Sequence, residues 1–367
     1  MKRILFFFGF WLCAQFAFVS MSMAQERREF YRSIRALGMG NSAVAVTNDE
    51  SSLLLNPAGL GKLRNFYGTV FDPEIETSDK TVSMYNARAF SQPWTLADAI
   101  PAAVAVPGDQ FHFRGQLFPS FVARNFGLGL LQKYDVDAVY DSTTARADTF
   151  YRNDLGLVLG YNLRLFDGRV KIGFTGRLIN RIEVKETAFD TTQALDLPSL
   201  GTAGIAKEGT GFGGDIGIML AAPWTMIPTI GAVLRDAGGT NFAMSSGQRL
   251  SQATSRPATV AQDLDVGIAL FPIHRNNVRS VWTIEYKGVL TAQNETDPTK
   301  LYHGGVEVNF GDLLFVRAGY NQRYWTGGLE LASERFQIQL ASYGEEVGTA
   351  AASKEDRRYL FKVAFRF

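Results

Sequence analysis

The chain has 367 residues, of which 37 are Lys or Arg, 36 are Asp or Glu, 13% are aromatic and one is Cys. The balanced charge argues against a nucleic-acid-binding protein, which needs a basic excess to neutralise phosphates, and the aromatic content excludes intrinsic disorder. Only the first stretch of the chain is apolar enough to span a bilayer, which argues against a membrane protein built of many helices.

Residues 1–24 indicate a secretory signal peptide. Lys2 and Arg3 precede an apolar stretch from Ile4 to Val19, and Ser22-Met23-Ala24 places small residues at a cleavage site. We expect cleavage after Ala24, and the alternative is an uncleaved anchor helix. Large residues precede Cys13, so lipidation is not expected, and cleavage would leave a mature chain without a thiol. This excludes thiol catalysis and cysteine-ligated metal sites.

Residues 25–65 lack the alternation of regular strands and carry two glycine-containing motifs. The first is Arg35-Ala36-Leu37-Gly38-Met39-Gly40 and the second is Asn56-Pro57-Ala58-Gly59-Leu60, with the polar segment Thr47 to Ser52 between them. Gly38 and Gly40 permit positive φ and close backbone approach. Asn56-Pro57 favours a fixed bend, which would turn this segment from the interior of the fold into its wall.

The remainder of the chain alternates apolar and polar residues with a period of two, which predicts long strands. Between residues 170 and 184, Ile172 and Phe174 fall on one face, whereas Lys171 and Arg177 fall on the other. The same pattern recurs after residue 260, where Ile284 alternates with Glu285. A soluble sandwich would also alternate, with its apolar face inward.

Strand length and aromatic placement favour a transmembrane barrel instead, with the apolar face outward. The predicted strands run about ten residues or more, as tilted membrane strands do, whereas soluble strands usually have about five or six. Tyr134, Tyr161 and Trp325 lie near strand ends, where interfacial aromatic girdles occur.

The last predicted strand, 359–367, ends on a phenylalanine. It is similar to the C-terminal signal that the bacterial outer-membrane assembly machinery reads, although Lys362 stands where that signal often has Gly. The residues that form this assembly signal are Tyr359, Phe361, Val363, Phe365 and Phe367. We therefore expect the assembly machinery to be a partner and the protein to lie in the bacterial cell outer membrane.

Short turns and long loops alternate along the chain, as they do when periplasmic turns are short. The predicted turns are 125–127, 166–168, 222–228, 272–278, 311–312 and 332–335, and the predicted external loops are 91–116, 141–148, 188–209, 238–261, 292–299, 321–324 and 346–356. This gives thirteen strands from residue 117 onward. A further strand comes from either Phe66–Phe71 or Thr81–Phe90. Residues 66–367 are thus expected to form an all-β, 14-stranded antiparallel transmembrane β-barrel, with some helical character at Thr95–Val106 in the first loop.

Residues 35–60 resemble the start of the FadL family of outer-membrane transporters for hydrophobic compounds, and of its PorV-like relatives. In these proteins an R-A-x-G-M-G start, an acidic polar link and an N-P-A-G-L segment open the mature chain. The resemblance implies the same strand number and an N-terminal hatch, residues 25–65, that plugs the lumen. It assigns hatch or gating roles to Gly38, Met39, Gly40, Asn56, Pro57, Ala58 and Gly59. The alternative is that these residues only seal a pore.

Charges of both signs are expected to face the lumen, which suits ion pairs with a plug better than ion selection. They are Lys133, Asp135, Arg152, Asp154, Lys171, Arg177, Arg181, Glu183, Asp215, Asp265, Glu285, Lys287, Glu307, Arg317 and Glu330.

The resemblance further implies uptake of hydrophobic compounds such as long-chain fatty acids, with lateral release through a kinked strand. Segments 127–129 and 210–214 carry the glycines that such a kink could use. Candidate ligand-binding residues in the expected loops are Phe111, Phe113, Phe189, Phe242 and Met244, with Arg114 and Lys207 as partners for a carboxylate.

No catalytic motif marks an enzyme. G-x-S-x-G and H-E-x-x-H are absent, and His112, His274 and His303 are far apart in sequence. We expect no enzymatic activity, cofactor or metal site, and a monomer whose partners are outer-membrane lipids and hydrophobic small molecules. The rival function is a PorV-like, non-transporting barrel that shuttles or scaffolds secreted or surface proteins, and a general porin is a third.

Overall fold

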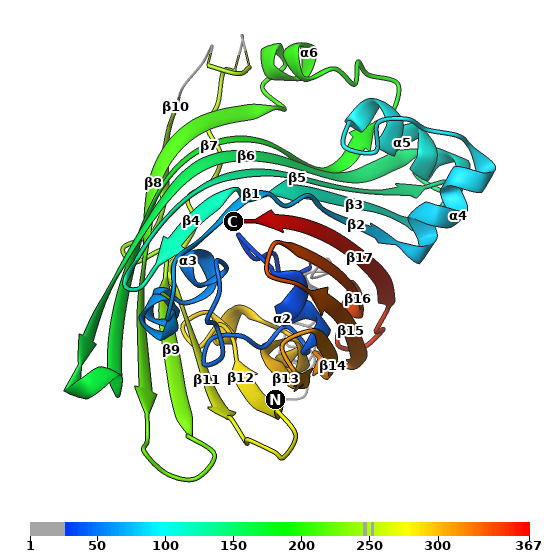
Figure 1. Cartoon of the computed structure of the whole chain (residues 1–367). Helices are drawn as coiled ribbons and strands as arrows, with labels where there is room; N and C mark the ends of the chain where they lie inside the picture. Colours follow the sequence, from blue (N-terminus) through cyan, green and yellow to red (C-terminus); the bar gives the residue numbers. More distant parts are fainter. Residues whose placement is uncertain (1–25, 245–247, 251–252) are drawn as a thin grey trace, which may run out of the picture.

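The computed structural model describes residues 26–244, 248–250 and 253–367, so the expected signal peptide, 1–24, lies outside the described residues. Within these residues, 17 strand segments form one antiparallel sheet that closes on itself as a barrel (Figure 1). The continuous wall strands are β5 (Phe126–Asp141), β6 (Arg146–Leu165), β7 (Val170–Asp190), β8 (Lys207–Ala221), β11 (Asp263–Leu270), β12 (Val278–Tyr286), β13 (Tyr302–Phe310), β14 (Leu314–Asn321), β15 (Tyr324–Ala332), β16 (Phe336–Glu346) and β17 (Glu355–Arg366). None of the helices in the described part of the chain has the length and apolarity to cross a membrane.

Three further wall strands are each interrupted once. They consist of β1 (Tyr67–Phe71) with β2 (Glu74–Ser78), β3 (Gln110–Leu117) with β4 (Ser120–Ala123), and β9 (Thr229–Arg235) with β10 (Asn241–Met244). The two pieces of each pair share a neighbour, since β1 and β2 both pair with β17, β3 and β4 with β5, and β9 and β10 with β8. Counted in this way, the 17 segments make 14 wall strands, and the predicted number is confirmed.

Apolar side chains face outward and charged side chains face the centre, as the alternation predicts. Leu178 is 52% exposed and Ile284 is 72% exposed, whereas their neighbours Arg177 and Glu285 are buried. All but one of the fifteen predicted lumen charges are buried, and Arg152 is half-buried. An apolar outer belt around a polar, filled centre is the arrangement of a membrane barrel.

Of the two candidates for the first strand, Phe66–Phe71 corresponds to β1. The other, Thr81–Phe90, is not strand, since residues 81–87 belong to helix α4 (Asp79–Ala87), which Ser78 caps by accepting a hydrogen bond from the Thr81 amide. Residues 110–116 are not loop but strand β3, and β10 lies inside the predicted loop 238–261. The expected helical segment is present as α5 (Leu96–Ala105).

Strand β3 alternates polar and apolar residues as the other strands do, but both of its faces are covered. Arg114 contacts the hatch at the Arg32 carbonyl and His112 contacts the lumen-facing Asp137, so Phe111 and Phe113 point outward. There they pack beneath α4 and α5, together with outward residues of β5–β7 and with α6 (Leu197–Thr202). Figure 1 shows α5 and α6 on the side of these strands opposite α2. The external loops thus form an apolar lobe on the outer wall.

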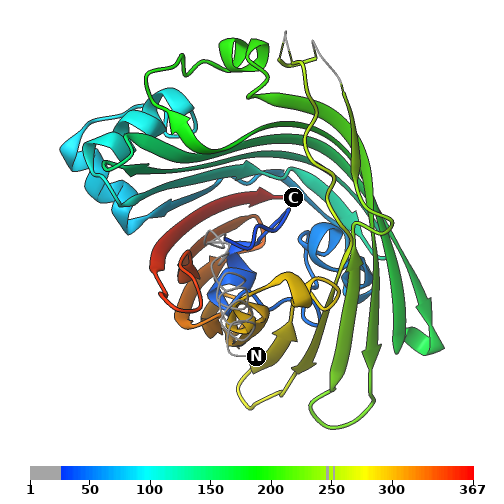
Figure 2. The ribbon, with the colours of Figure 1, turned by 180° about the vertical axis from the view of Figure 1, so that it is seen from behind.

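The remaining helices are short. α2 (Ile34–Gly38), α3 (Ser52–Leu55) and the 3-10 helix η1 (Pro57–Lys62) belong to the N-terminal segment, and η2 (Phe166–Gly168), η3 (Ala292–Asn294) and η4 (Pro298–Leu301) lie in turns and loops. Figures 1 and 2 show α2 and α3 inside the barrel from opposite directions. The C-terminal strand presents Tyr359, Phe361, Phe365 and Phe367 to the outside, with Val363 half-buried, and their role as an assembly signal stays a prediction.

Candidate functional site: the hatch and the cavities beside it

The N-terminal segment folds locally before it meets the wall. Ser33 caps α2 by accepting a hydrogen bond from the Ala36 amide at 3.2 Å. Asn56 caps η1 in the same way, accepting from the Ala58 amide at 3.1 Å, and Pro57 occupies the first position of this helix, where its missing N–H is not needed. The side-chain amide of Asn56 also donates to the Val44 carbonyl at 2.7 Å, which ties the second motif to the segment that follows the first.

Glycines of the wall make room for the first hatch motif. A Cβ on Gly305 of β13 would lie 2.3 Å from the Met39 carbonyl oxygen, and one on Gly319 of β14 would lie 2.4 Å from the Gly40 nitrogen. Gly40 itself has φ +68°, and a Cβ there would lie 2.2 Å from the Gly304 carbonyl oxygen. Backbone therefore lies directly on backbone at this contact.

The second motif meets the wall in the same way. A Cβ on Gly173 would lie 2.1 Å from the Pro57 carbonyl carbon, and one on Gly217 would lie 2.0 Å from Asn56 Oδ1. Gly59 differs, because its close neighbours are Thr47 and Ser52 of the hatch itself. The predicted hatch residues thus gather at the interface between hatch and wall or within the hatch, and their role in gating stays a prediction.

Ion pairs fasten the hatch to the wall. The hatch side chains Glu26, Arg27, Arg28, Glu29, Arg32 and Arg35 pair with Arg358, Asp263, Asp137, Lys287, Glu345 and Glu307 respectively, at 2.5–3.1 Å. Glu285 accepts hydrogen bonds from the amides of Ala43 and Val44. Burial raises the pKa of the Glu29 carboxyl, but Lys287 and Arg32 outweigh burial and leave it below its usual range. The lumen charges of both signs therefore form ion pairs with the plug, as predicted.

One of these networks contains the group that most resembles a metal site in the described residues, His112 with Asp135 and Asp137. Both ring nitrogens of His112 are engaged, Nδ1 with Asp137 at 2.6 Å and Nε2 with Glu76 at 3.0 Å. Asp137 also pairs with Arg28. The cluster therefore belongs to the fastening of the hatch.

The largest apolar contact between hatch and wall lies near the wall's interruptions. Leu53, Leu54 and Leu60 pack against Val122, Leu131 and Val158, and the Tyr31 ring lies 5.8 Å from that of Phe118. Gly127 lies against Leu53 and Gly129 against Phe118, so these glycines create room for side chains. Residues 127–129, the first predicted kink, are paired with a strand on either side, as are residues 210–212 of the second. Gly213 and Gly214 pair with β7 but lie beside the interruption between β9 and β10.

The wall is also interrupted at two neighbouring prolines. Pro73 separates β1 from β2 and Pro119 separates β3 from β4, and proline has no N–H for the ladder. Asp72 bridges the gap, since its carboxylate accepts from the Phe118 amide at 2.6 Å and pairs with Lys362 at 3.1 Å. Pro119, inside the strand expected from residue 117, was a signal that sequence reasoning passed over, whereas Pro73 lies just beyond the expected strand Phe66–Phe71.

Replacing Asp72 by alanine should weaken the wall at this interruption. The buried Phe118 amide would lose its acceptor, and Lys362 would lose one of its two carboxylates. We expect a loss of about 1–3 kcal/mol in the free energy of unfolding, measured by urea titration of the heat-modifiable folded form on gels. Asp109→Ala is the control, since no hydrogen bond of its side chain occurs in the described structure, and an equal effect of both variants would contradict the bridging role.

A small cavity of about 220 Å³ lies between the hatch and the external loops. Its wall includes residues 27–31 of the hatch and Phe242, a predicted ligand-binding residue. The other six predicted ligand-binding residues do not line this cavity. Phe111, Phe113 and Phe189 lie in the external apolar lobe, Arg114 is paired with Glu74 and Glu76, Met244 is exposed and Lys207 is half-buried. The structure does not bring these seven side chains together.

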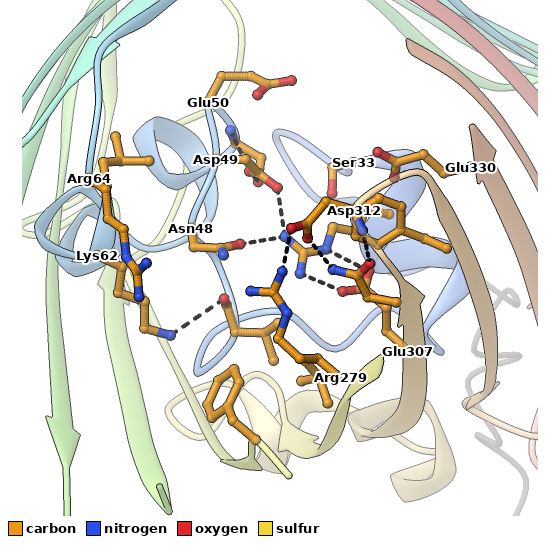
Figure 3. A pocket seen from close by; sticks show the side chains of 18 of the residues that line it. Ser33, Asn48, Asp49, Glu50, Lys62, Arg64, Arg279, Glu307, Asp312 and Glu330 are labelled. Atoms are coloured by element: carbon orange, nitrogen blue, oxygen red, sulfur yellow. Dashed lines mark hydrogen bonds and ion pairs between the residues drawn. The ribbon is translucent and has the colours of Figure 1, made fainter. Parts of the chain in front are cut away.

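A larger cavity, about 990 Å³, lies on the other side of the hatch and is called the vestibule below. Its lining combines hatch residues 46, 48–51 and 61–65 with residues next to the short turns, such as Arg124, Pro272 and Asp312. Because these turns and the C-terminus mark the periplasmic end, the vestibule opens toward the periplasm. Figure 3 shows Lys62 and Arg64 across this cavity from Glu307 and Asp312.

Together, these features define a transmembrane β-barrel with a fastened internal plug. No family model matches the chain, and no curated protein matches it. Among solved structures, the chain is similar to CymD, described as a monoaromatic hydrocarbon channel, with 12% identity over 91% of this chain and 97% of CymD and a TM-score of 0.55. It is also similar to the toluene transporter TodX of Pseudomonas putida, with 13% identity over 90% and 96% of the two chains and a TM-score of 0.50. The shared property at these identities is the fold.

Proposed function

We propose that this protein is a channel of the bacterial outer membrane for hydrophobic compounds. The observation that carries the proposal is the plug: ion pairs fill the polar lumen, while an apolar contact between hatch and wall lies at the strand interruptions. Ions and sugars would meet a closed barrel. A hydrophobic molecule has an apolar surface to follow, and the solved structures of the same fold are described as hydrocarbon channels.

The interruption at Pro73 and Pro119 is the place where such a molecule would leave the barrel. Tyr31 and Phe118 line it from within, and Phe121, Ile75 and Phe361 expose apolar side chains on the lipid side. A small movement of the hatch would separate the Tyr31 and Phe118 rings and join the lumen to the membrane. This route replaces the glycine kinks expected from the sequence. The substrate class includes fatty acids, as the sequence analysis expected, and small aromatic compounds.

Uptake of a neutral hydrophobic dye tests the proposal. Cells that produce the full chain should accumulate N-phenylnaphthylamine faster than cells that produce a Tyr31→Trp variant, in which a larger ring fills the contact with Phe118. Tyr85→Trp, a change at an exposed position of α4, is the matched control and should behave as the wild type. Dye uptake equal to that of cells without the protein would refute the channel function. Retention of a secreted protein by the purified barrel would favour the shuttle instead.

A further inference from the structure

The vestibule carries an excess of cationic side chains over carboxylates. Ten cationic side chains line it against five carboxylates. Every one of these carboxylates has a cationic partner: Asp49 and Glu307 pair with Arg35, Glu330 with Arg317, Asp312 with Arg279, and Glu50 with Lys362 and Arg366. The acids of the vestibule are therefore already neutralised by half of its cations.

The other five cations have no carboxylate partner among the described residues. They are Lys62 and Arg64 of the hatch, Arg124 beside the first short turn, and Arg164 and Lys171 at the periplasmic ends of β6 and β7. Three of them donate to carbonyl oxygens: Lys62 to that of Ala45 at 2.9 Å, Lys171 to that of Gly168, and Arg124 to those of Leu63 and Arg64 at 3.3 Å. Elsewhere in the lumen, cations such as Arg177, Arg181 and Arg358 each face a carboxylate.

These cations also lie close to one another. The Lys171 side chain packs against Gly61, next to Lys62, and a Cβ on Gly61 would lie 3.0 Å from Lys171 Cδ. Lys171 is 93% buried, since only 7% of it is exposed. Burial lowers the pKa of Lys62 to about 7, and the charges of Lys171 and Arg35 add to this shift. A bound anion would relieve the repulsion.

Apolar surface adjoins the cations. The Lys62 ammonium lies 4.8 Å from the centre of the Phe271 ring, and Leu63, Ile227 and Val281 also line the vestibule. A ligand that fits this lining has a negative head group and an apolar tail. An inorganic anion would leave the apolar part of the surface unused, and a neutral hydrocarbon would leave the cations unpaired.

We infer that the vestibule is a binding site for an amphipathic anion on the periplasmic side of the hatch. This inference rests on the proposed channel function, which supplies hydrophobic molecules to the interior of the barrel. The head group is the carboxylate of a transported hydrophobic acid or the phosphate of a phospholipid, and both present the same chemistry to the site. Lys62, Arg164 and Lys171 hold the head group, and Phe271 contacts the tail.

Equilibrium dialysis of the purified full chain in dodecyl maltoside tests the site with three probes: octanoate, lysophosphatidylglycerol and octanol. The test variant combines Lys62→Gln, Arg164→Gln and Lys171→Gln. Its matched control combines Arg169→Gln, Arg275→Gln and Arg335→Gln, which removes three exposed periplasmic cations that do not line the vestibule. We expect the test variant to bind the anionic probe about tenfold or more weakly than both the wild type and the control.

Each possible result of the dialysis experiment either supports or overturns the anion site. Charge-dependent binding of octanoate or of lysophosphatidylglycerol supports the site and identifies its source. Equal binding of octanol and octanoate, equal affinity of the test variant and the wild type, or no binding of either anion would overturn it. The dye-uptake experiment uses a neutral probe and does not depend on the vestibule cations. A failure of the channel function and a failure of the anion site would therefore give different results.

Discussion

Replacing Gly305 by valine is expected to displace the hatch and open the barrel to ions. Gly305 faces the lumen, and a Cβ there would lie 2.3 Å from the Met39 carbonyl oxygen. Valine suits a strand, so the wall can accept the side chain while the hatch backbone has to move. In planar bilayers, the conductance of this variant should exceed that of the wild type by about tenfold or more, because an unplugged barrel of this size encloses water.

Gly327→Val is the matched control for this experiment. Gly327 lies in the neighbouring part of the wall, but the nearest atom to a Cβ there is the Arg317 carbonyl oxygen at 3.9 Å. Its conductance should stay at the wild-type level. A Gly305→Val barrel that is folded, as heat modifiability shows, and still closed would mean that the Met39 contact does not seat the hatch.

Removing the Arg32 guanidinium should release the hatch without unfolding the wall. Arg32 pairs with Glu345 at 3.1 Å, and both side chains are buried. An Arg32→Met variant leaves Glu345 buried with the amide of Gln322 as its remaining side-chain donor. Breaking a buried pair in this way costs about 3–5 kcal/mol. We expect trypsin to cleave the hatch of this variant much faster than that of the wild type, with cleavage sites identified by mass spectrometry.

The wall itself should not respond to this change, because the hatch does not contribute strands to it. The folded barrel should therefore keep its mobility on unheated gels. Arg64→Met serves as the control, since Arg64 is exposed and has no carboxylate partner in the described part of the chain. Loss of the folded barrel in Arg32→Met, or cleavage no faster than in the control, would contradict a role for this ion pair in holding the hatch.

Most of the wall could be predicted because alternation is a local property. Whether Lys171 or Ile172 faces the lumen depends on the period of the strand alone, and the structure confirms both placements. The same alternation is present in β3, where Gln110, His112 and Arg114 alternate with Phe111 and Phe113, but this segment was assigned to the first external loop. Because of the same misassignment, Phe111 and Phe113 were predicted to bind a ligand, although they face the external lobe.

The candidate site depended on contacts that no local pattern contains. Arg32 meets Glu345 across more than 300 residues of chain, and Gly305 meets Met39 only after the barrel has closed around the hatch. The interruption at Pro73 opens a gap in the wall only because Pro119 interrupts the adjacent strand at the same level. The unpaired cations of the vestibule can be identified only after each of its carboxylates has been assigned a cationic partner.

The amino-acid order alone was therefore sufficient for the inverted barrel, its strand number and the existence of the hatch motifs, because strand period, turn length and glycine spacing act over a few residues. The fastening of the hatch, the gap in the wall and the unpaired cations were decided by the closed fold, because each depends on which distant side chains share a buried space and which find no partner there.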